Sequence, residues 1–332
     1  MLGISGGLRI DHIITHDKVA RAAAMGGNAV FAAVGARVWT DKVTIVARAG
    51  SNYPRSWIEE LKRTNLADDG IRTLDTPQDH RTFYAYLDAN TRDDASPETH
   101  YAAIGAPMPE ELHGYVHSYA GQESPEDIDP LAPTAADITC HISSYHLSPM
   151  AVRSHLDLPV VARTMGAKTI SVDPGERYMV PGMLTSIEHI LGQANIFMPS
   201  AMEVASLFGD DNRAPGELSR RMRWFADRGP EIVVFKLGSD GSLIFQKRDD
   251  QIWHLPAIPV LVIDVTGAGD SYCGGFAGAF STGGDPIAAA IAGTVSASFA
   301  VEDYGAMHVM FASTAMRDRR ADWVRAHMTP LT

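Results

Sequence analysis

The chain has 332 residues, 45% of them hydrophobic, which is enough to bury a sizeable core. Its 28 lysines and arginines against 40 aspartates and glutamates give a formal net charge of −12, which repels nucleic acids and anionic membrane surfaces. Cys140 and Cys273 lie far apart in unlike contexts, residues 1–18 lack the apolar core of a signal peptide, and no apolar run is long enough to span a membrane. We therefore expect a folded cytoplasmic protein with neither a nucleic-acid partner nor a membrane partner.

Short β-rich runs alternate with helical patterns along the chain. A helix predicted at 28–39 begins at Asn28, a residue type that favours the N-cap, and a helix predicted at 53–66 has Pro54 near its start. Residues 233–246 form a predicted antiparallel hairpin around a Gly-Ser-Asp-Gly turn. Strands separated by helix-length segments are typical of βαβ units, so we expect an α/β fold with a mostly parallel sheet. The main strands are predicted at 42–50, 138–147, 168–175, 194–200 and 231–238.

One region does not follow this alternation of strands and helices. Residues 81–89 alternate strictly between two faces, and residues 99–105 follow after a polar turn, so the pair is predicted as a β-hairpin. Together with an early strand at 6–14, the hairpin forms either a small secondary sheet that covers a site or an antiparallel extension of the main sheet. The pattern alone does not choose between these alternatives.

The stretch DVTGAGDSYCGGFAGAF at 264–280 follows an apolar run predicted as a strand and enters a helix rich in glycine and alanine. Successive glycines before a helix let several backbone N–H groups point at one spot, and the helix dipole adds positive charge there, so we expect an anion site. Asp270 at the helix start is then placed to accept a proton from a hydroxyl during phosphoryl transfer. The structural alternative is that Asp270 only caps the helix and that the glycines serve close helix–sheet packing.

The run D-x-T-G-A-G-D at 264–270, followed by a small-residue helix, resembles the second signature of the ribokinase-like (PfkB) family of carbohydrate kinases. The resemblance covers nearly the whole chain. It implies a single kinase domain over residues 1–332, with a three-layer α/β/α core and a small β-sheet lid formed by about 6–16 and 79–105. It assigns Asp270 as the catalytic base and an anion hole to the backbone of Gly267, Ala268 and Gly269.

The same resemblance assigns substrate-binding residues. GGLRIDHII resembles the opening strand of the family, so Asp11 takes the role of binding sugar hydroxyls and Arg9 points into the same pocket. MGGNAVFAAVGARVW resembles the first signature, in which Gly26 and Gly27 let the sugar approach the backbone and Asn28 bonds it. The alternative for Asn28 is that it only caps its helix.

Two further segments resemble the family with a substitution each. SVDPGERY resembles a segment that places Asp173 and Arg177 at the substrate, although Gly175 stands where the family has asparagine. MPSAMEVASLFG resembles the motif that organises Mg2+ through water, with Ser200 in place of asparagine and Glu203 retained. Serine and glutamate at this spacing also make a capping box, and both roles are compatible.

The nucleotide side is assigned by resemblance as well. FKLGSDGSLIF resembles the hairpin near the ATP phosphates and ribose, which places Lys236 and Gly238 there. TVSASFAVEDYGAM resembles the helix and loop that enclose adenine, which places Thr294 at the nucleotide, and Thr266 of the signature joins the same group.

The sequence as a whole predicts an ATP-dependent and Mg2+-dependent kinase that phosphorylates a hydroxyl, most simply a primary one, of a sugar. A nucleoside kinase of the same fold is the alternative within the enzymes, and a non-catalytic sugar or nucleotide sensor is the alternative outside them. A homodimer formed through the lid is a further expectation, because pairing would cover the exposed edge of that sheet.

Overall fold

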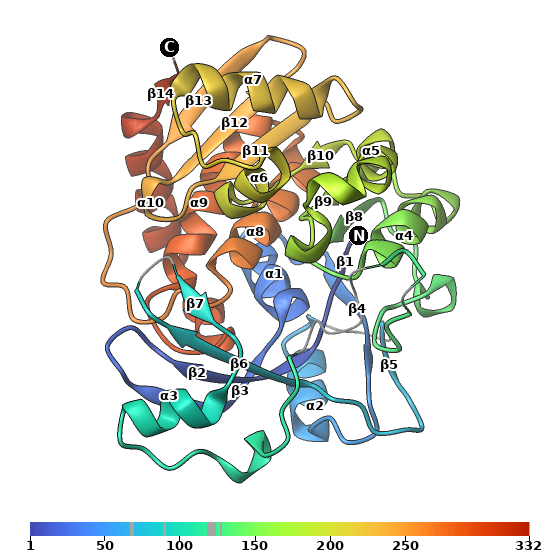
Figure 1. Cartoon of the computed structure of the whole chain (residues 1–332). Coiled ribbons are helices and arrows are strands. Elements are labelled where there is room, and N and C mark those ends of the chain that lie inside the picture. The colour runs from blue at the N-terminus through green and yellow to red at the C-terminus, as the bar shows by residue number, and fades with distance from the viewer. Residues whose placement is uncertain (67–69, 89–90, 118–123, 127, 332) are drawn as a thin grey trace.

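The computed structural model describes residues 1–66, 70–88, 91–117, 124–126 and 128–331 (Figure 1). The strands are β1 (Leu2–Ser5), β2 (Arg9–Ile14), β3 (Ala20–Gly26), β4 (Val43–Ala49), β5 (Ile71–Thr73), β6 (Arg81–Tyr86), β7 (Arg92–Asp93), β8 (Ser144–Leu147), β9 (Thr169–Val172), β10 (Ile196–Phe197), β11 (Ile232–Lys236), β12 (Ser242–Gln246), β13 (Gln251–Leu255) and β14 (Thr329–Pro330). The α-helices are α1 (Asn28–Arg37), α2 (Arg55–Arg63), α3 (Pro97–Ala103), α4 (Val152–Thr164), α5 (Leu184–Gln193), α6 (Ala201–Phe208), α7 (Pro215–Ala226), α8 (Ala268–Gly283), α9 (Pro286–Ala300) and α10 (Thr314–His327).

The main sheet has ten strands in the order β14-β13-β12-β11-β10-β9-β8-β1-β4-β5. Pairing is parallel from β11 through β5, and β12, β13 and β14 are antiparallel additions at one edge. The predicted hairpin at 233–246 is confirmed as β11 and β12, and the mostly parallel sheet is confirmed. Because parallel strands end at the same edge, the residues that follow β1, β8, β9, β10 and β11 meet along one line.

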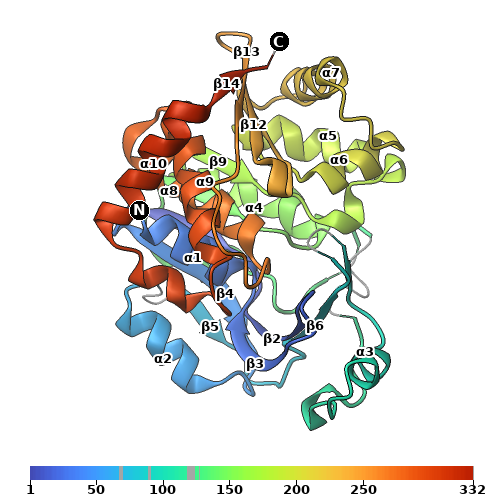
Figure 2. The same ribbon diagram turned by 90° about the vertical axis from the view of Figure 1, so that its left-hand side faces the viewer.

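Helices cover both faces of this sheet, which confirms the three-layer core. Figure 2 shows α1, α8, α9 and α10 on one side and α4, α5, α6 and α7 on the other. Each side has its own buried cluster: one includes Phe31, Ile45 and Phe276, and the other includes Leu147 and Phe225. Strands buried on both faces are rich in Val and Ile because neither face meets water.

A second sheet, which we call the small sheet, lies apart from the first and has the order β3-β2-β6-β7. β2 pairs with β3 antiparallel and with β6 parallel, and the register with β3 shifts between Asp11 and Ile13. Phe83 and Tyr101 lie in a separate small core between this sheet and α3. The small secondary sheet is therefore confirmed, and the alternative of an extension of the main sheet is wrong.

The hairpin within the small sheet differs from the prediction. Residues 99–105 are not a strand, since most of them belong to α3, and the hairpin partner of β6 is the short β7. Pro97 at the first helical position favours a helix start, and a short apolar run such as this one fits either period. Tyr101 packs beside Phe83 with ring centroids 6.1 Å apart, so helical spacing still buries the aromatic side chain.

Several predicted strands are shorter than expected. β8 begins only at Ser144 and β10 holds two residues, to which Ser200 adds a single bridge with Lys236. The apolar run that precedes the 264–280 stretch is not a strand: residues 256–262 have no regular structure. Pro256 and Pro259 lack the N–H groups that a sheet ladder needs, which explains the failure of this prediction.

The helix starts also refine the sequence analysis. α1 begins at Asn28 itself, and its N-cap is Gly27, so the prediction that Asn28 caps this helix is wrong. Pro54 is the N-cap of α2, near the predicted start.

Within the described part of the chain, no helix combines the length and the apolar character needed to cross a bilayer.

Candidate active site

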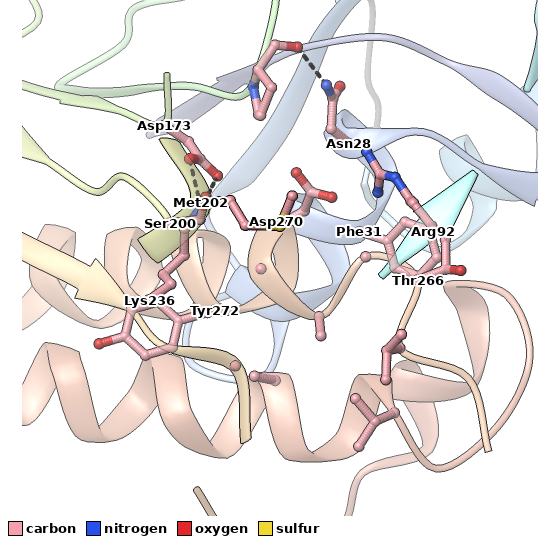
Figure 3. A pocket seen from close by; sticks show the side chains of 18 of the residues that line it. Asn28, Phe31, Arg92, Asp173, Ser200, Met202, Lys236, Thr266, Asp270 and Tyr272 are labelled. Atoms are coloured by element: carbon pink, nitrogen blue, oxygen red, sulfur yellow. Dashed lines mark hydrogen bonds and ion pairs between the residues drawn. The ribbon is translucent and has the colours of Figure 1, made fainter. Parts of the chain in front are cut away.

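A cavity of about 700 Å³ lies between the carboxyl ends of the main-sheet strands and the small sheet (Figure 3). Of the predicted site residues, only Gly26 is not among those that line it. The cavity thus brings together residues from the two ends of the chain. The predicted residues that line it are Arg9, Asp11, Gly27, Asn28, Arg177, Glu203, Lys236, Gly238, Thr266, Gly267, Ala268, Gly269, Asp270 and Thr294.

The turn at 264–270 leads into α8. Gly267 occupies the N-cap with φ of 72°, in the left-handed region, and a Cβ added there would collide with the Phe31 ring. Only glycine therefore fits this position. The first N–H groups of a helix have no intrahelical acceptors and the helix dipole adds partial positive charge, so the start of α8 can hold an anion at the cavity wall.

Asp270 is not the cap of α8, because Gly267 holds that position and Asp270 lies three residues further on, at the cavity. The interpretation that Asp270 only caps the helix is therefore wrong. The glycines later in the helix do serve packing, but against helices: Gly274 lies against Ala32 of α1, and Gly278 lies against Ala36. The two glycine sets thus have different roles, one at the turn and one between helices.

Burial and nearby charges shift the pKa of Asp270. Burial raises the pKa of this carboxyl, and the positive charges of Lys236 and Arg92 oppose the shift. Figure 3 shows Asp270 between the Asp173–Lys236 pair on one side and Arg92 on the other. A carboxylate whose pKa is raised in this way is a better proton acceptor than one in water, as general base catalysis requires.

Lys236 at the end of β11 is held by an ion pair. Its Nζ donates to both carboxylate oxygens of Asp173, which follows β9, at 2.6 Å each. The Cys273 thiol donates to the same carboxylate at 3.3 Å. Burial opposes the charge on Lys236 and is the largest single effect, but the neighbouring Asp173, Cys273 and Glu203 together raise the pKa of Lys236, so this amine stays charged inside the cavity.

Ser200 and Glu203 form a capping box at the start of α6. The Ser200 N–H donates to Glu203 Oε2 at 2.6 Å, and the Glu203 N–H donates to Ser200 Oγ at 3.2 Å. The capping-box interpretation is therefore confirmed. Glu203 nevertheless lines the cavity, so a role in the cap does not remove this residue from the site.

One end of the cavity is built around Asp11, which is 3% exposed. Thr82 of β6 donates its hydroxyl hydrogen to the carboxylate, and burial raises the pKa of Asp11 to about 6. A Cβ at Gly26 would overlap this carboxylate, so Gly26 makes room for Asp11 although it does not line the cavity. Arg9 donates to the Asp79 carbonyl at 3.3 Å.

Asn28 is already bonded within the protein. Its Oδ1 accepts from the Gly7 N–H at 2.6 Å, and its Nδ2 donates to the Pro149 carbonyl at 2.5 Å. The side chain therefore joins the loops after β1 and β8. Arg177 lies at the rim of the cavity, where its Nη2 contacts the His117 ring at 2.9 Å.

Some cavity residues have no counterpart in the sequence prediction. Arg92 of β7 and Tyr86 of β6 enter the cavity from the small sheet, and residues 257–262 contribute apolar side chains to it. The alternation in β6 was a signal for Tyr86, but a two-residue strand leaves no periodic pattern, so nothing in the sequence marked Arg92.

Comparison with known proteins agrees with this architecture. A crystal structure of a putative ribokinase II from E. coli in complex with ATP and Mg2+ superposes with a TM-score of 0.67 at 18% identity and covers 98% of this chain and 99% of that one. The fold is therefore ribokinase-like. The chain also matches the model of the pfkB family of carbohydrate kinases over residues 22–312, and it belongs to that family.

Two curated relatives match over part of the chain. An uncharacterized sugar kinase of Archaeoglobus fulgidus is 36% identical over 138 residues, which are 42% of this chain and 52% of the relative. A nucleoside kinase of Methanothermobacter thermautotrophicus is 31% identical over 174 residues, which are 52% of each chain. The chain thus spans about half the length of each of these two relatives.

Proposed function

We propose that the protein is an ATP-dependent kinase that phosphorylates a hydroxyl group of a sugar or nucleoside. The observation that carries the proposal is the position of Asp270 in the first turn of α8, in one cavity with Asp11, which we assign to the acceptor end, and Lys236, which we assign to the nucleotide end. Family membership supports the kinase activity, and the names of the relatives include both sugar and nucleoside kinases.

In the proposed reaction Asp270 accepts the proton of the acceptor hydroxyl as its oxygen attacks the γ-phosphorus and the bond to the leaving ADP breaks. The N–H groups at the start of α8, from Gly267 to Asp270, hold the charge on the transferred group. Lys236, kept charged by Asp173, neutralises the phosphates of the nucleotide. Asp11 orients the acceptor through its carboxylate.

Gly238 and Thr294 line the same cavity at the nucleotide end, which supports their predicted contact with ATP. The apolar segment at 257–262 joins them there. We assign these residues to the base and ribose of the nucleotide, because a mostly apolar wall with a few polar groups is how pockets hold such ligands.

The residues present fit a magnesium ion held largely by phosphates and water. Among the residues that the structure describes, no group of three or more His, Cys, Asp or Glu side chains is placed to enclose a metal. Mg2+ usually binds through one or two carboxylates plus substrate phosphates rather than through an all-protein cage, and Glu203 supplies such a carboxylate at the cavity. When bound, the ion would offset negative charge on the phosphates.

The small sheet acts as the lid in this proposal, and its closure would exclude water from the reacting groups.

A homodimer formed through this sheet remains a prediction. β3 is one of its edges and exposes Arg21, Ala22 and Ala23, so pairing of two β3 edges is physically possible. Light scattering of the purified protein measures the mass that decides this point. The cytoplasmic location also remains a prediction.

An acceptor screen tests the proposed function. Purified protein, ATP and Mg2+ are incubated with a panel of free sugars and a panel of nucleosides, and ADP formation is followed. We expect acceptor-dependent ADP release from one panel, which also distinguishes a sugar kinase from a nucleoside kinase. Thermal stabilisation by a sugar or nucleoside without any ADP formation would instead support the non-catalytic sensor.

A further inference from the structure

A hydrogen-bond chain joins the small sheet to the 264–270 turn. The Tyr86 hydroxyl of β6 lies 2.9 Å from Thr266 Oγ1, although the two residues are 180 positions apart in the sequence. Thr266 Oγ1 is 2.7 Å from Asp264 Oδ1, to which it donates. A threonine hydroxyl has one hydrogen, and Asp264 takes it, so Tyr86 donates to Thr266 and the direction of the chain is fixed.

Arg92 continues this chain on the small sheet. Its guanidinium lies within hydrogen-bonding reach of the Tyr86 hydroxyl, which still has lone pairs to accept after donating to Thr266. Two more contacts hold Arg92: its guanidinium carbon is 4.5 Å from the centre of the Tyr84 ring, and an amino group is 3.9 Å from Glu176 after β9. The side chain thus has contacts both within the small sheet and with the segment that follows β9.

The position of this guanidinium has a chemical consequence. In Figure 3 Arg92 lies beside Phe31 and Thr266, on the side of Asp270 away from Lys236. Arg92 lines the same cavity as Asp270, and it comes from the small sheet, which also carries Asp11. A planar guanidinium with several donors suits the oxygens of a phosphoryl group.

We propose that Tyr86 and Thr266 are positioning residues whose hydrogen bond docks the small sheet on the turn, and that this docking holds Arg92 where it binds the phosphoryl group during transfer. Thr266 therefore serves the lid rather than the nucleotide, because its hydroxyl already bonds Tyr86 and Asp264. The role of Arg92 rests on the proposed function, but the docking contact does not. Since Asp11 and Arg92 share the small sheet, one docking event supplies both acceptor binding and this positive charge.

The docking contact is tested by hydrogen exchange without any turnover. Tyr86→Phe and Thr266→Val each remove one hydroxyl and keep the size of the side chain. We expect amide exchange in residues 81–86 and 264–270 to rise about three- to tenfold in each variant, and no further in the double variant. Tyr101→Phe is the matched control, since its hydroxyl is buried in the same small sheet core and has no hydrogen-bond partner among the described residues.

Unchanged exchange in both single variants, or effects that simply add in the double variant, would overturn the docking contact. An equal rise in Tyr101→Phe would also overturn it, because the effect would then come from loosening of the small sheet in general.

Kinetics tests the role of Arg92. We expect Arg92→Gln to lower kcat about a hundredfold with a much smaller change in the KM for ATP, and Arg92→Lys to recover part of the loss. Tyr86→Phe is expected to lower kcat in the same pattern by a smaller factor. A rise in KM with unchanged kcat would overturn the proposed contact with the transferred group. If the wild-type protein phosphorylates no acceptor, the proposed function and the role of Arg92 both fail, and the exchange experiment still decides the docking contact.

Discussion

The 264–270 turn and the small sheet meet at the same cavity but are encoded in different ways. The turn is one continuous run in which Gly267 sets the backbone and Asp270 follows three residues later. The small sheet instead collects Asp11, Thr82 and Arg92 from three separate strands, and its pairing includes a register shift beside Asp11. Local chemistry therefore specifies the turn, whereas the small sheet depends on contacts between segments far apart in the sequence.

The largest effect is expected at the turn, from Asp270→Asn. This change keeps the shape of the side chain but removes the proton acceptor, so kcat should fall about a thousandfold while the fold and ATP binding persist. Steady-state kinetics measures kcat, and titration with ATP measures nucleotide binding. Asp322→Asn, on the exposed face of α10, is the matched control and should behave like the wild type. Retained turnover in Asp270→Asn would show that the turn does not supply the base.

Lys236→Met tests whether the nucleotide end depends on its ion pair. The substitution leaves the Asp173 carboxylate, which is 1% exposed, without its cation, so we expect the free energy of unfolding to fall by about 3 kcal/mol. Denaturant unfolding measures this change. Combining it with Asp173→Asn should restore part of the loss, whereas Lys62→Met on the exposed face of α2 should change little. A double variant no more stable than Lys236→Met would contradict the pairing.

The pH dependence of the free energy of unfolding tests the burial of Asp11 in the small sheet. Burial raises the pKa of Asp11 from 3.8 to about 6, so between these values the folded state binds the proton more tightly than the unfolded state. Wild-type stability should therefore fall as the pH rises through this window, and Asp11→Asn should escape that fall. Its advantage over the wild type should grow from pH 4 to pH 7 by up to about 3 kcal/mol, measured by unfolding at each pH. A difference that stays constant with pH would mean that Asp11 is not buried as the small sheet requires.

The smallest expected effect concerns the capping box of α6. Ser200→Ala removes the acceptor for the Glu203 N–H, so the free energy of unfolding should fall by about 1 kcal/mol. Unfolding experiments measure it, with Ser239→Ala at the exposed hairpin turn as a control. If the variant is as stable as the wild type, Ser200 does not stabilise the helix start.

These regions also show what the sequence revealed and what it did not. The hairpin of β11 and β12 and the turn at Gly267 were predicted because each depends on a short local pattern. The parallel sheet was predicted because strands alternate with helix-length segments along the chain. Residues 99–105 were predicted as a strand, but most of them belong to α3. A short apolar run satisfies both periods, and the packing of Tyr101 against Phe83 favours the helix.

The same reasoning applies within the site. Asp11 and Asp270 were identified through motifs, and the structure places both at one cavity. Asn28 was predicted to bond the sugar, with capping of its helix as the alternative. It lines the cavity, and its amide joins two loops, which only the folded arrangement of Gly7 and Pro149 determines. Arg92 went unpredicted because its place depends on a two-residue strand.

In the proposed reaction, the 264–270 turn carries the base for phosphoryl transfer to a hydroxyl. The most direct test is phosphorus NMR of reactions containing ATP, Mg2+ and the best acceptor from the screen, with the wild type and with Asp270→Asn in parallel. We expect a new phosphate ester with the wild type and essentially none with the variant over the same period. Equal ester formation by both proteins, or no ester with the wild type for any acceptor, would contradict it.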